Sequence, residues 1–290
     1  MIRPATPYRF ALAGALALML AACGKDEPAA AAPSGSGPEA TIVHSARLLR
    51  EGDLGKVVEA SVPPAQLEQA RQSWLEQIRK DDPSDEDRAQ FAETMSRLTA
   101  PDAEAQLMAE IRPQLEQFQG DMRAQLPAMV AMGKGFLIAA INESEEIKPE
   151  QRPQVVALVN AVGSWVETGE FASVDRAEKA VREVTAAARR MNVTTLDHVQ
   201  AKDFDGVMQL ASIGFDGFKK ALNAYDIDLD ASFESVRAEV LERNGNEAKV
   251  RVHFQFLGTP LTFDTTMVEI DGRWYGKDAI ENLDSISDGA

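Results

Sequence analysis

The period of the hydrophobic pattern changes once along this chain, close to Tyr225. Between residues 42 and 225, apolar residues recur at steps of three and four, which is the spacing of one face of an α-helix. After Tyr225, apolar and polar residues alternate, as in a strand that buries one of its faces. Because the two patterns occupy separate stretches, we predict an α+β fold, with a mainly helical bundle followed by a C-terminal antiparallel sheet.

Turn-forming residues divide the alternating stretch into four strands, the last of them short. The turns are Asn244-Gly245-Asn246, Gly258-Thr259-Pro260 and Asp271-Gly272, the last being a strong hairpin signal. We predict a four-stranded meander packed on the helix 204–225, and closing its turns sets a register. The predicted pairs are Arg243–Glu247, Val240–Val250 and Ala238–Val252 in the first hairpin, and Phe254–Phe263 and His253–Asp264 in the second.

Residues 126–142 (LPAMVAMGKGFLIAAIN) are apolar on every side of a helix except at Lys134. The interpretation we favour is the central helix of a bundle, buried all round. The alternative is a helix that inserts into a membrane or binds a partner. The stretch is about 17 residues long and contains a charge and two glycines, so it suits a membrane span less well than a core helix.

The N-terminus resembles the signal peptide of bacterial lipoproteins. Arg3 and Arg9 precede the apolar run 11–21, which ends at Leu20-Ala21-Ala22-Cys23 and is similar to a lipobox. The resemblance implies that 1–22 is removed as a signal peptide and that the Cys23 thiol carries lipid. Gly24, rather than Asp, follows the cysteine. The resemblance therefore implies an outer-membrane anchor, with the protein facing the periplasm.

We expect four parts after the signal peptide. Residues 23–40 are rich in Pro, Gly, Ser and Ala and predict a lipid-anchored flexible tether. A helical domain (41–200), a unit of one helix and the sheet (201–280) and a tail (281–290) follow. The last quarter of the chain, which closes on Asp271-Gly272-Arg273-Trp274-Tyr275, resembles envelope domains related to nuclear transport factor 2. That resemblance implies a sheet curled around a pocket.

The charge of the chain limits its partners. Without Arg3 and Arg9 the mature protein has 28 basic and 46 acidic residues, a net charge of −18. Such a surface repels the phosphates of nucleic acids, so we expect no nucleic-acid partner and favour a basic protein surface or a cation. Cys23 is the only cysteine, so no disulfide forms within the chain.

The sequence contains no motif that predicts a catalytic or a metal-binding site. The histidines His44, His198 and His253 are scattered, which disfavours zinc. Asp226-Ile227-Asp228-Leu229-Asp230 lacks the glycine and the glutamate of a calcium loop, so we interpret it as the start of a strand. His253 opposite Asp264 could form an acid–base couple but is more typical of a solvated pair.

We therefore expect no catalytic, cofactor-binding or metal-binding residues, and Cys23 as the site of lipidation. The expected function is that of a lipid-anchored envelope protein. It would bind a protein partner without catalysis or act in envelope assembly. Two alternatives remain open: a protein that binds a small ligand in a pocket under the C-terminal sheet, and a periplasmic hydrolase.

Overall fold

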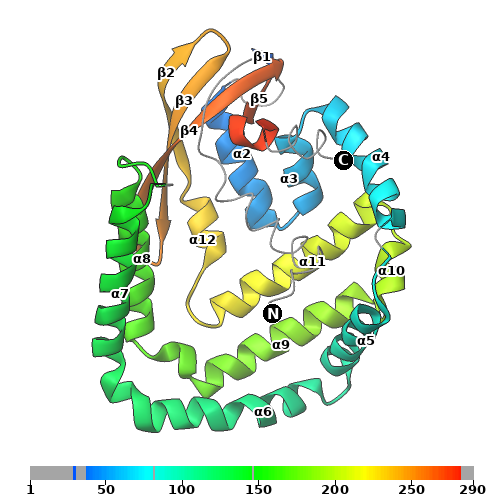
Figure 1. Ribbon diagram of the computed structural model, residues 1–290, viewed down its shortest axis with the longest axis vertical. Helices are drawn as coiled ribbons and strands as arrows, with labels where there is room; N and C mark the ends of the chain where they lie inside the picture. The colour runs from blue at the N-terminus through cyan, green and yellow to red at the C-terminus, as the bar shows by residue number, and fades with distance from the viewer. Residues whose placement is uncertain (1–28, 31–36, 81, 146, 282–290) are drawn as a thin grey trace. The chain divides into compact units, whose positions relative to one another are not determined.

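The computed structural model describes residues 29–30, 37–80, 82–145 and 147–281 (Figure 1). The predicted signal peptide 1–22, the lipidation residue Cys23, most of the tether 23–40 and nearly all of the tail 281–290 lie outside these ranges. The predicted α+β class is confirmed, because the described chain is mainly helical up to α12 and then forms an antiparallel sheet.

The chain divides into two compact units. Among the described residues, the sheet unit comprises 29–30, 37–73, Val236–His253 and 263–281, and the helical unit comprises those of Trp74–Ser235 together with Phe254–Thr262. These units differ from the ranges 41–200 and 201–280 that we expected from the periodicity. The physical reason is that the first helices of the chain join the strands, whereas the periodicity grouped them with the later helices.

The sheet unit contains the first helices and most of the strands. Its strands lie in the order β4, β3, β2, while β5 and the two-residue β1 each pair with β4. The elements are α2 (Pro38–Glu51), α3 (Leu54–Ser61), the start of α4 (Pro64–Lys80), β1 (Ala29–Ala30), β2 (Arg237–Asn244), β3 (Glu247–Phe256), β4 (Thr259–Asp271) and β5 (Arg273–Gly276).

The break between α2 and α3 is built from cap residues. Gly52 ends α2 in the left-handed conformation (φ 79°), and its N–H donates to the carbonyls of Leu48 and Leu49. Asp53 then begins α3 by accepting a hydrogen bond from the Lys56 N–H at 3.0 Å. The stretch 45–62, which reads as one helical segment in the sequence, is therefore two helices.

Helix α2 packs against the sheet and contributes Ile42 to its core. The buried cluster on this face is formed by Ala248, Val250, Met267 and Trp274. We expected helix 204–225 to pack on the sheet, but α11 (Phe204–Asn223) belongs to the helical unit and packs on α9. Both α2 and α11 carry an apolar stripe. The prediction chose α11 because it lies nearer to the strands in the sequence, and that choice was wrong.

The register of the first hairpin is confirmed in its outer part. Val240 pairs with Val250 and Ala238 with Val252, as predicted. Next to the turn the prediction is wrong, because Asn244 rather than Arg243 lies opposite Glu247. The turn has two residues instead of three, and an irregularity between Val240 and Glu242 restores the predicted pairing beyond it.

The second hairpin has a shorter turn than predicted. Leu257 and Gly258 form it alone, with φ angles of 49° and 73°, between Phe256 and Thr259. A regular ladder from this turn shifts the predicted pairs by two residues and sets Arg251 opposite Asp264. The Arg251 guanidinium indeed donates to both oxygens of that carboxylate, at 2.7 and 3.0 Å.

The helical unit is organised around α9, which packs against α5, α6 and α11. At the contact with α11, a Cβ added to Gly217 would lie 2.4 Å from the Cβ of Ala187, so the two helices approach closely. The elements are α5 (Asp85–Thr99), α6 (Ala103–Gln117), η1 (Phe118–Met122), η2 (Arg123–Gln125), α7 (Leu126–Glu143), α8 (Arg152–Glu167), η3 (Glu170–Ala172), α9 (Val174–Met191), α10 (Leu196–Gln200), α11 and α12 (Leu229–Glu234).

Candidate functional site

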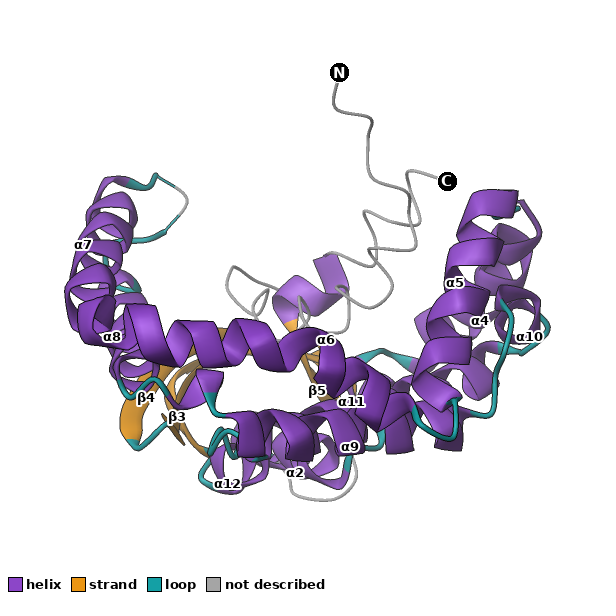
Figure 2. Cartoon of the chain, turned by 90° about the horizontal axis from the view of Figure 1, so that it is seen from below, coloured by secondary structure: helices purple, strands orange, loops and turns teal. Residues whose placement is uncertain are grey.

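Helix α7 is not buried all round, contrary to our expectation of a central bundle helix. Figures 1 and 2 show it side by side with α8, the helix it packs against most extensively. Leu126 and Ile141 are buried, and half-buried Val130, Lys134 and Ile138 continue the same stripe at steps of three and four. The rest of the helix is exposed.

The opposite side of α7 carries large exposed apolar side chains. Met129, Met132 and Phe136 are 44%, 62% and 72% exposed, and Leu137 on the flank is 56% exposed. Apart from the adjoining backbone of the helix itself, no described atom lies within 4 Å of where a Cβ on Gly133 or Gly135 would be, so the surface there is also open. We call Met129, Met132, Phe136 and Leu137 the α7 face.

Charge is absent from the α7 face although the chain is strongly acidic. No Asp or Glu occurs between Asp121 and Glu143. The helix contains two charged residues, Lys134 and the terminal Glu143; Lys134 lies over Gly163 of α8, and its Nζ donates to Glu167 at 2.9 Å. The ion pair therefore neutralises Lys134 on the side of α8, and the α7 face is purely apolar.

By length and composition, one described helical stretch could cross a membrane. It is Arg123–Glu143, with a mean hydropathy of 1.5, of which 11% is buried. Its partner helix does not share this composition, because α8 contains Gln154, Asn160 and Ser164.

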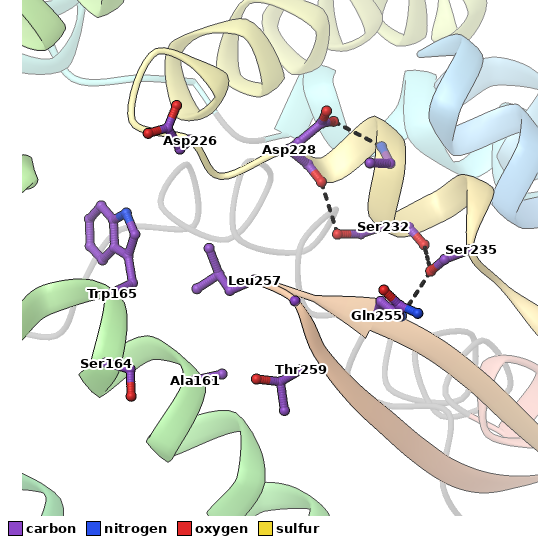
Figure 3. Close-up of a pocket in the computed structure, with 12 residues that line it drawn as sticks. Ala161, Ser164, Trp165, Asp226, Asp228, Ser232, Ser235, Gln255, Leu257 and Thr259 are labelled. Atoms are coloured by element: carbon purple, nitrogen blue, oxygen red, sulfur yellow. Dashed lines mark hydrogen bonds between the residues drawn. The ribbon is translucent and has the colours of Figure 1, made fainter. Parts of the chain in front are cut away.

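A second candidate site is an open cavity of about 480 Å³ within the helical unit. It lies between α8, the segment 226–235 and the β3–β4 turn, as Figure 3 shows. Its apolar wall includes Trp165 and Leu257, and its polar lining includes Ser164, Gln255 and Thr259.

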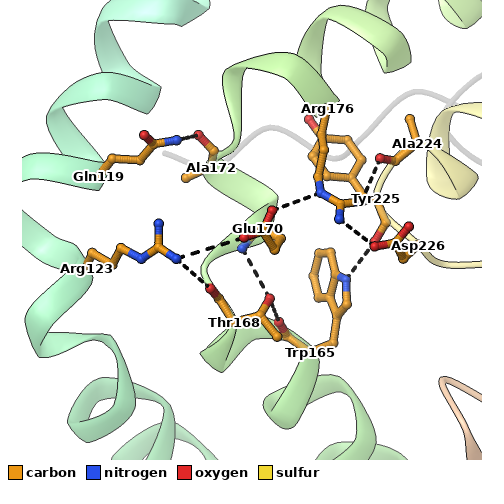
Figure 4. Close-up of polar contacts among 10 residues, drawn as sticks. All are labelled: Gln119, Arg123, Trp165, Thr168, Glu170, Ala172, Arg176, Ala224, Tyr225 and Asp226. Carbon is orange, nitrogen blue, oxygen red and sulfur yellow. Dashed lines mark hydrogen bonds and ion pairs between the residues drawn. The ribbon is translucent and has the colours of Figure 1, made fainter.

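A network of polar contacts fixes one wall of this cavity (Figure 4). The Trp165 indole N–H donates to the Tyr225 carbonyl at 2.9 Å, which holds the ring in place. Arg176 connects η3 to the segment that follows α11. It donates to the Glu170 carboxylate at 3.0 Å and to the Ala224 carbonyl at 3.1 Å, and it pairs with Asp226. That guanidinium lowers the pKa of the Asp226 carboxyl, so the carboxylate stays ionised and engaged.

The acidic run at 226–230 does not converge on one point. Asp226 pairs with Arg176, Asp228 accepts from the Ala231 N–H at 2.8 Å, and Asp230 pairs with Lys219. The interpretation as a strand start is wrong, because Asp228 caps α12 instead. Within the described residues no group of three or more His, Cys, Asp or Glu side chains could hold a metal ion.

His253 and Asp264, which we considered as a couple, each have another partner. His253 lies 3.3 Å from Glu239, while Asp264 accepts from Arg251. His253 is not among the residues that line the cavity. The cavity was not predicted from the sequence. The one feature that could have indicated it is the bulky Leu257 directly before Gly258 in a turn, where a small or polar residue is usual.

No protein-family model matches the chain, and neither a curated protein nor a solved structure matches it.

Proposed function

We propose that this is a lipid-anchored protein of the cell envelope that binds a protein partner without catalysis, in the manner of an assembly factor. The observation that carries the proposal is the α7 face, which exposes Met129, Met132, Phe136 and Leu137 to solvent. Contiguous apolar patches on a folded surface are typical of interaction sites.

The composition of the α7 face favours an apolar protein segment as its partner. Met129, Met132 and Phe136 stand at positions i, i+3 and i+7, the spacing by which helices bind one another. Methionine side chains are flexible and polarizable, so they adapt to more than one apolar surface. The acidic charge of the chain adds a preference for basic residues beside that segment.

A bilayer is a poorer occupant for the same helix. Lys134 lies near the middle of α7 and pairs with Glu167, the last residue of α8, and a charged group is costly within hydrocarbon even when it is paired. The polar residues of α8, Asn160 and Ser164 among them, would enter the bilayer together with α7.

The test in the cell is site-specific photo-crosslinking. A photoreactive amino acid in place of Phe136 is expected to form adducts with other envelope proteins. The same group at Val184, an exposed apolar residue of α9 outside the α7 face, is expected to form few. Adducts that are equal at the two positions, or that form at Phe136 with lipid alone, would contradict the proposal.

The lipid anchor is a second part of the proposal and rests on Leu20-Ala21-Ala22-Cys23, outside the described residues. Replacing Cys23 with Ala is expected to abolish labelling by radioactive palmitate, because the acceptor thiol is gone. The wild-type protein should be recovered with the outer membrane, and the variant should not. Equal labelling of both proteins would show that Cys23 is not the anchor.

A small-ligand function is favoured by one observation, the cavity beside Trp165, although this cavity lies in the helical unit at the β3–β4 turn and not under the C-terminal sheet as the alternative had it. For the periplasmic hydrolase, no observation favours the couple that we considered, since Glu239 lies beside His253 and Arg251 donates to Asp264. We therefore do not propose it.

A further inference from the structure

The cavity in the helical unit has the size and form of a small-molecule site. Its volume of about 480 Å³ falls within the range of roughly 300–1,000 Å³ that is typical of ligand pockets. It is half open, and the ring of Trp165 and the side chain of Leu257 form its apolar wall. Figure 3 shows Leu257 between the Trp165 ring and α12.

Unused hydrogen-bonding groups line the cavity. Among the described residues, the side chains of Ser164, Gln255 and Thr259 make no hydrogen bond. The hydroxyl of Ser232 donates to the Asp228 carbonyl at 2.9 Å and that of Ser235 to the Ser232 carbonyl at 2.6 Å. The oxygen of Ser232 keeps its capacity to accept, so the wall offers several polar contacts.

The charges around the cavity select an uncharged ligand. No Lys, Arg or His is among the described residues that line it, so none of them would neutralise an anion. Its acidic residues are already engaged, Asp226 by Arg176 and Asp228 by the N–H of Ala231. A cation would have to compete with these contacts.

Two of the residues that line the cavity have a strained backbone conformation. Leu257 and Asp226, both lining the cavity, adopt left-handed φ angles of 49° and 61°. A two-residue turn of this kind favours Asn-Gly, and a bulky residue in this region is unusual. Strain of this sort persists where the surroundings enforce it, and it is common at ligand sites.

We infer that the cavity binds a neutral polyhydroxylated ligand, such as a sugar ring. The C–H face of the ring packs on the indole of Trp165, whose electron-rich face suits partly positive hydrogens. The hydroxyl groups of the sugar bond to Ser164, Gln255 and Thr259. Leu257 fills the space beside the ring, which explains why the turn keeps a strained leucine. This inference is independent of the α7 face.

The test uses sugars that share one ring and differ in charge. Glucose and N-acetylglucosamine are neutral, glucuronate is an anion and glucosamine is a cation at neutral pH. Saturation-transfer NMR with the detergent-solubilised mature protein is expected to show millimolar binding of at least one neutral sugar. The charged sugars are expected to bind at least ten-fold more weakly.

Variants of the lining residues test whether the sugar binds in this cavity. Ser164→Ala combined with Gln255→Ala is expected to weaken binding at least ten-fold, whereas Gln90→Ala, on the exposed surface of α5, leaves it unchanged. Leu257→Asn is expected to keep or raise the Tm, because Asn-Gly suits the turn, and still to weaken binding. The inference is overturned if no neutral sugar binds, if the charged sugars bind equally well, or if the Ser164/Gln255 double variant binds like the wild type.

Discussion

Replacing Trp274 with Ala is expected to lower the free energy of unfolding by about 3–5 kcal/mol, the usual cost of removing a large buried aromatic side chain. Trp274 is 4% exposed and packs with Val250 and Met267 beneath α2. The Arg243 guanidinium lies 4.7 Å from the centre of its ring, so the substitution also removes a cation–π contact.

Urea denaturation followed by circular dichroism measures this loss. Leu241→Ala serves as the control, because Leu241 lies in the same sheet but is 41% exposed. We expect the control to change the free energy by no more than about 0.5–1 kcal/mol. A loss below about 1 kcal/mol for Trp274→Ala would mean that this residue does not anchor the core of the sheet unit.

Replacing Met132 and Phe136 together with Ala is expected to weaken binding of an apolar helical peptide about 30-fold. The pair are the most exposed large apolar residues of the α7 face, at 62% and 72%. Few residues of an interface are hot spots, and one hot spot contributes about 2 kcal/mol, which corresponds to about 30-fold in affinity; the predicted loss is that of one hot spot among the two residues. Alanine preserves the helix, so the fold should remain intact.

The probe for this prediction is a fluorescent amphipathic peptide of leucine and lysine, whose basic residues complement the acidic chain. Fluorescence anisotropy gives the Kd, and a thermal melt verifies that the double variant is folded. Val184→Ala, which also removes an exposed apolar side chain, is the matched control. Equal affinity in wild type and double variant would exclude the α7 face as the binding surface.

The alternation of strand residues predicted which faces are buried, but the predicted pairing is correct only in the outer part of the first hairpin. Val250, Val252 and Met267 are buried as the pattern indicated. Side chains on a strand repeat every two residues, so a register shifted by two keeps every side chain on its face. The error at the second turn therefore left the buried face correct and separated His253 from Asp264.

The exposure of α7 could not be read from its composition. A helix that is apolar all round is buried when several neighbours surround it and exposed when few do. The number of neighbours depends on tertiary contacts, and here α8 covers only the stripe from Leu126 to Ile141. The cavity escaped prediction for a similar reason, since Trp165, Ser232 and Leu257 come from distant parts of the sequence.

Methyl NMR of the methionine side chains during titration with the basic amphipathic peptide tests the central claim most directly. The account predicts that the signals of exposed Met129 and Met132 shift. Those of Met95 and Met108, which are 6% and 7% exposed, should stay in place. Shifts at Met95 or Met108 without shifts at Met129 and Met132, or no shift at any methionine, would contradict the claim that the α7 face binds apolar protein segments.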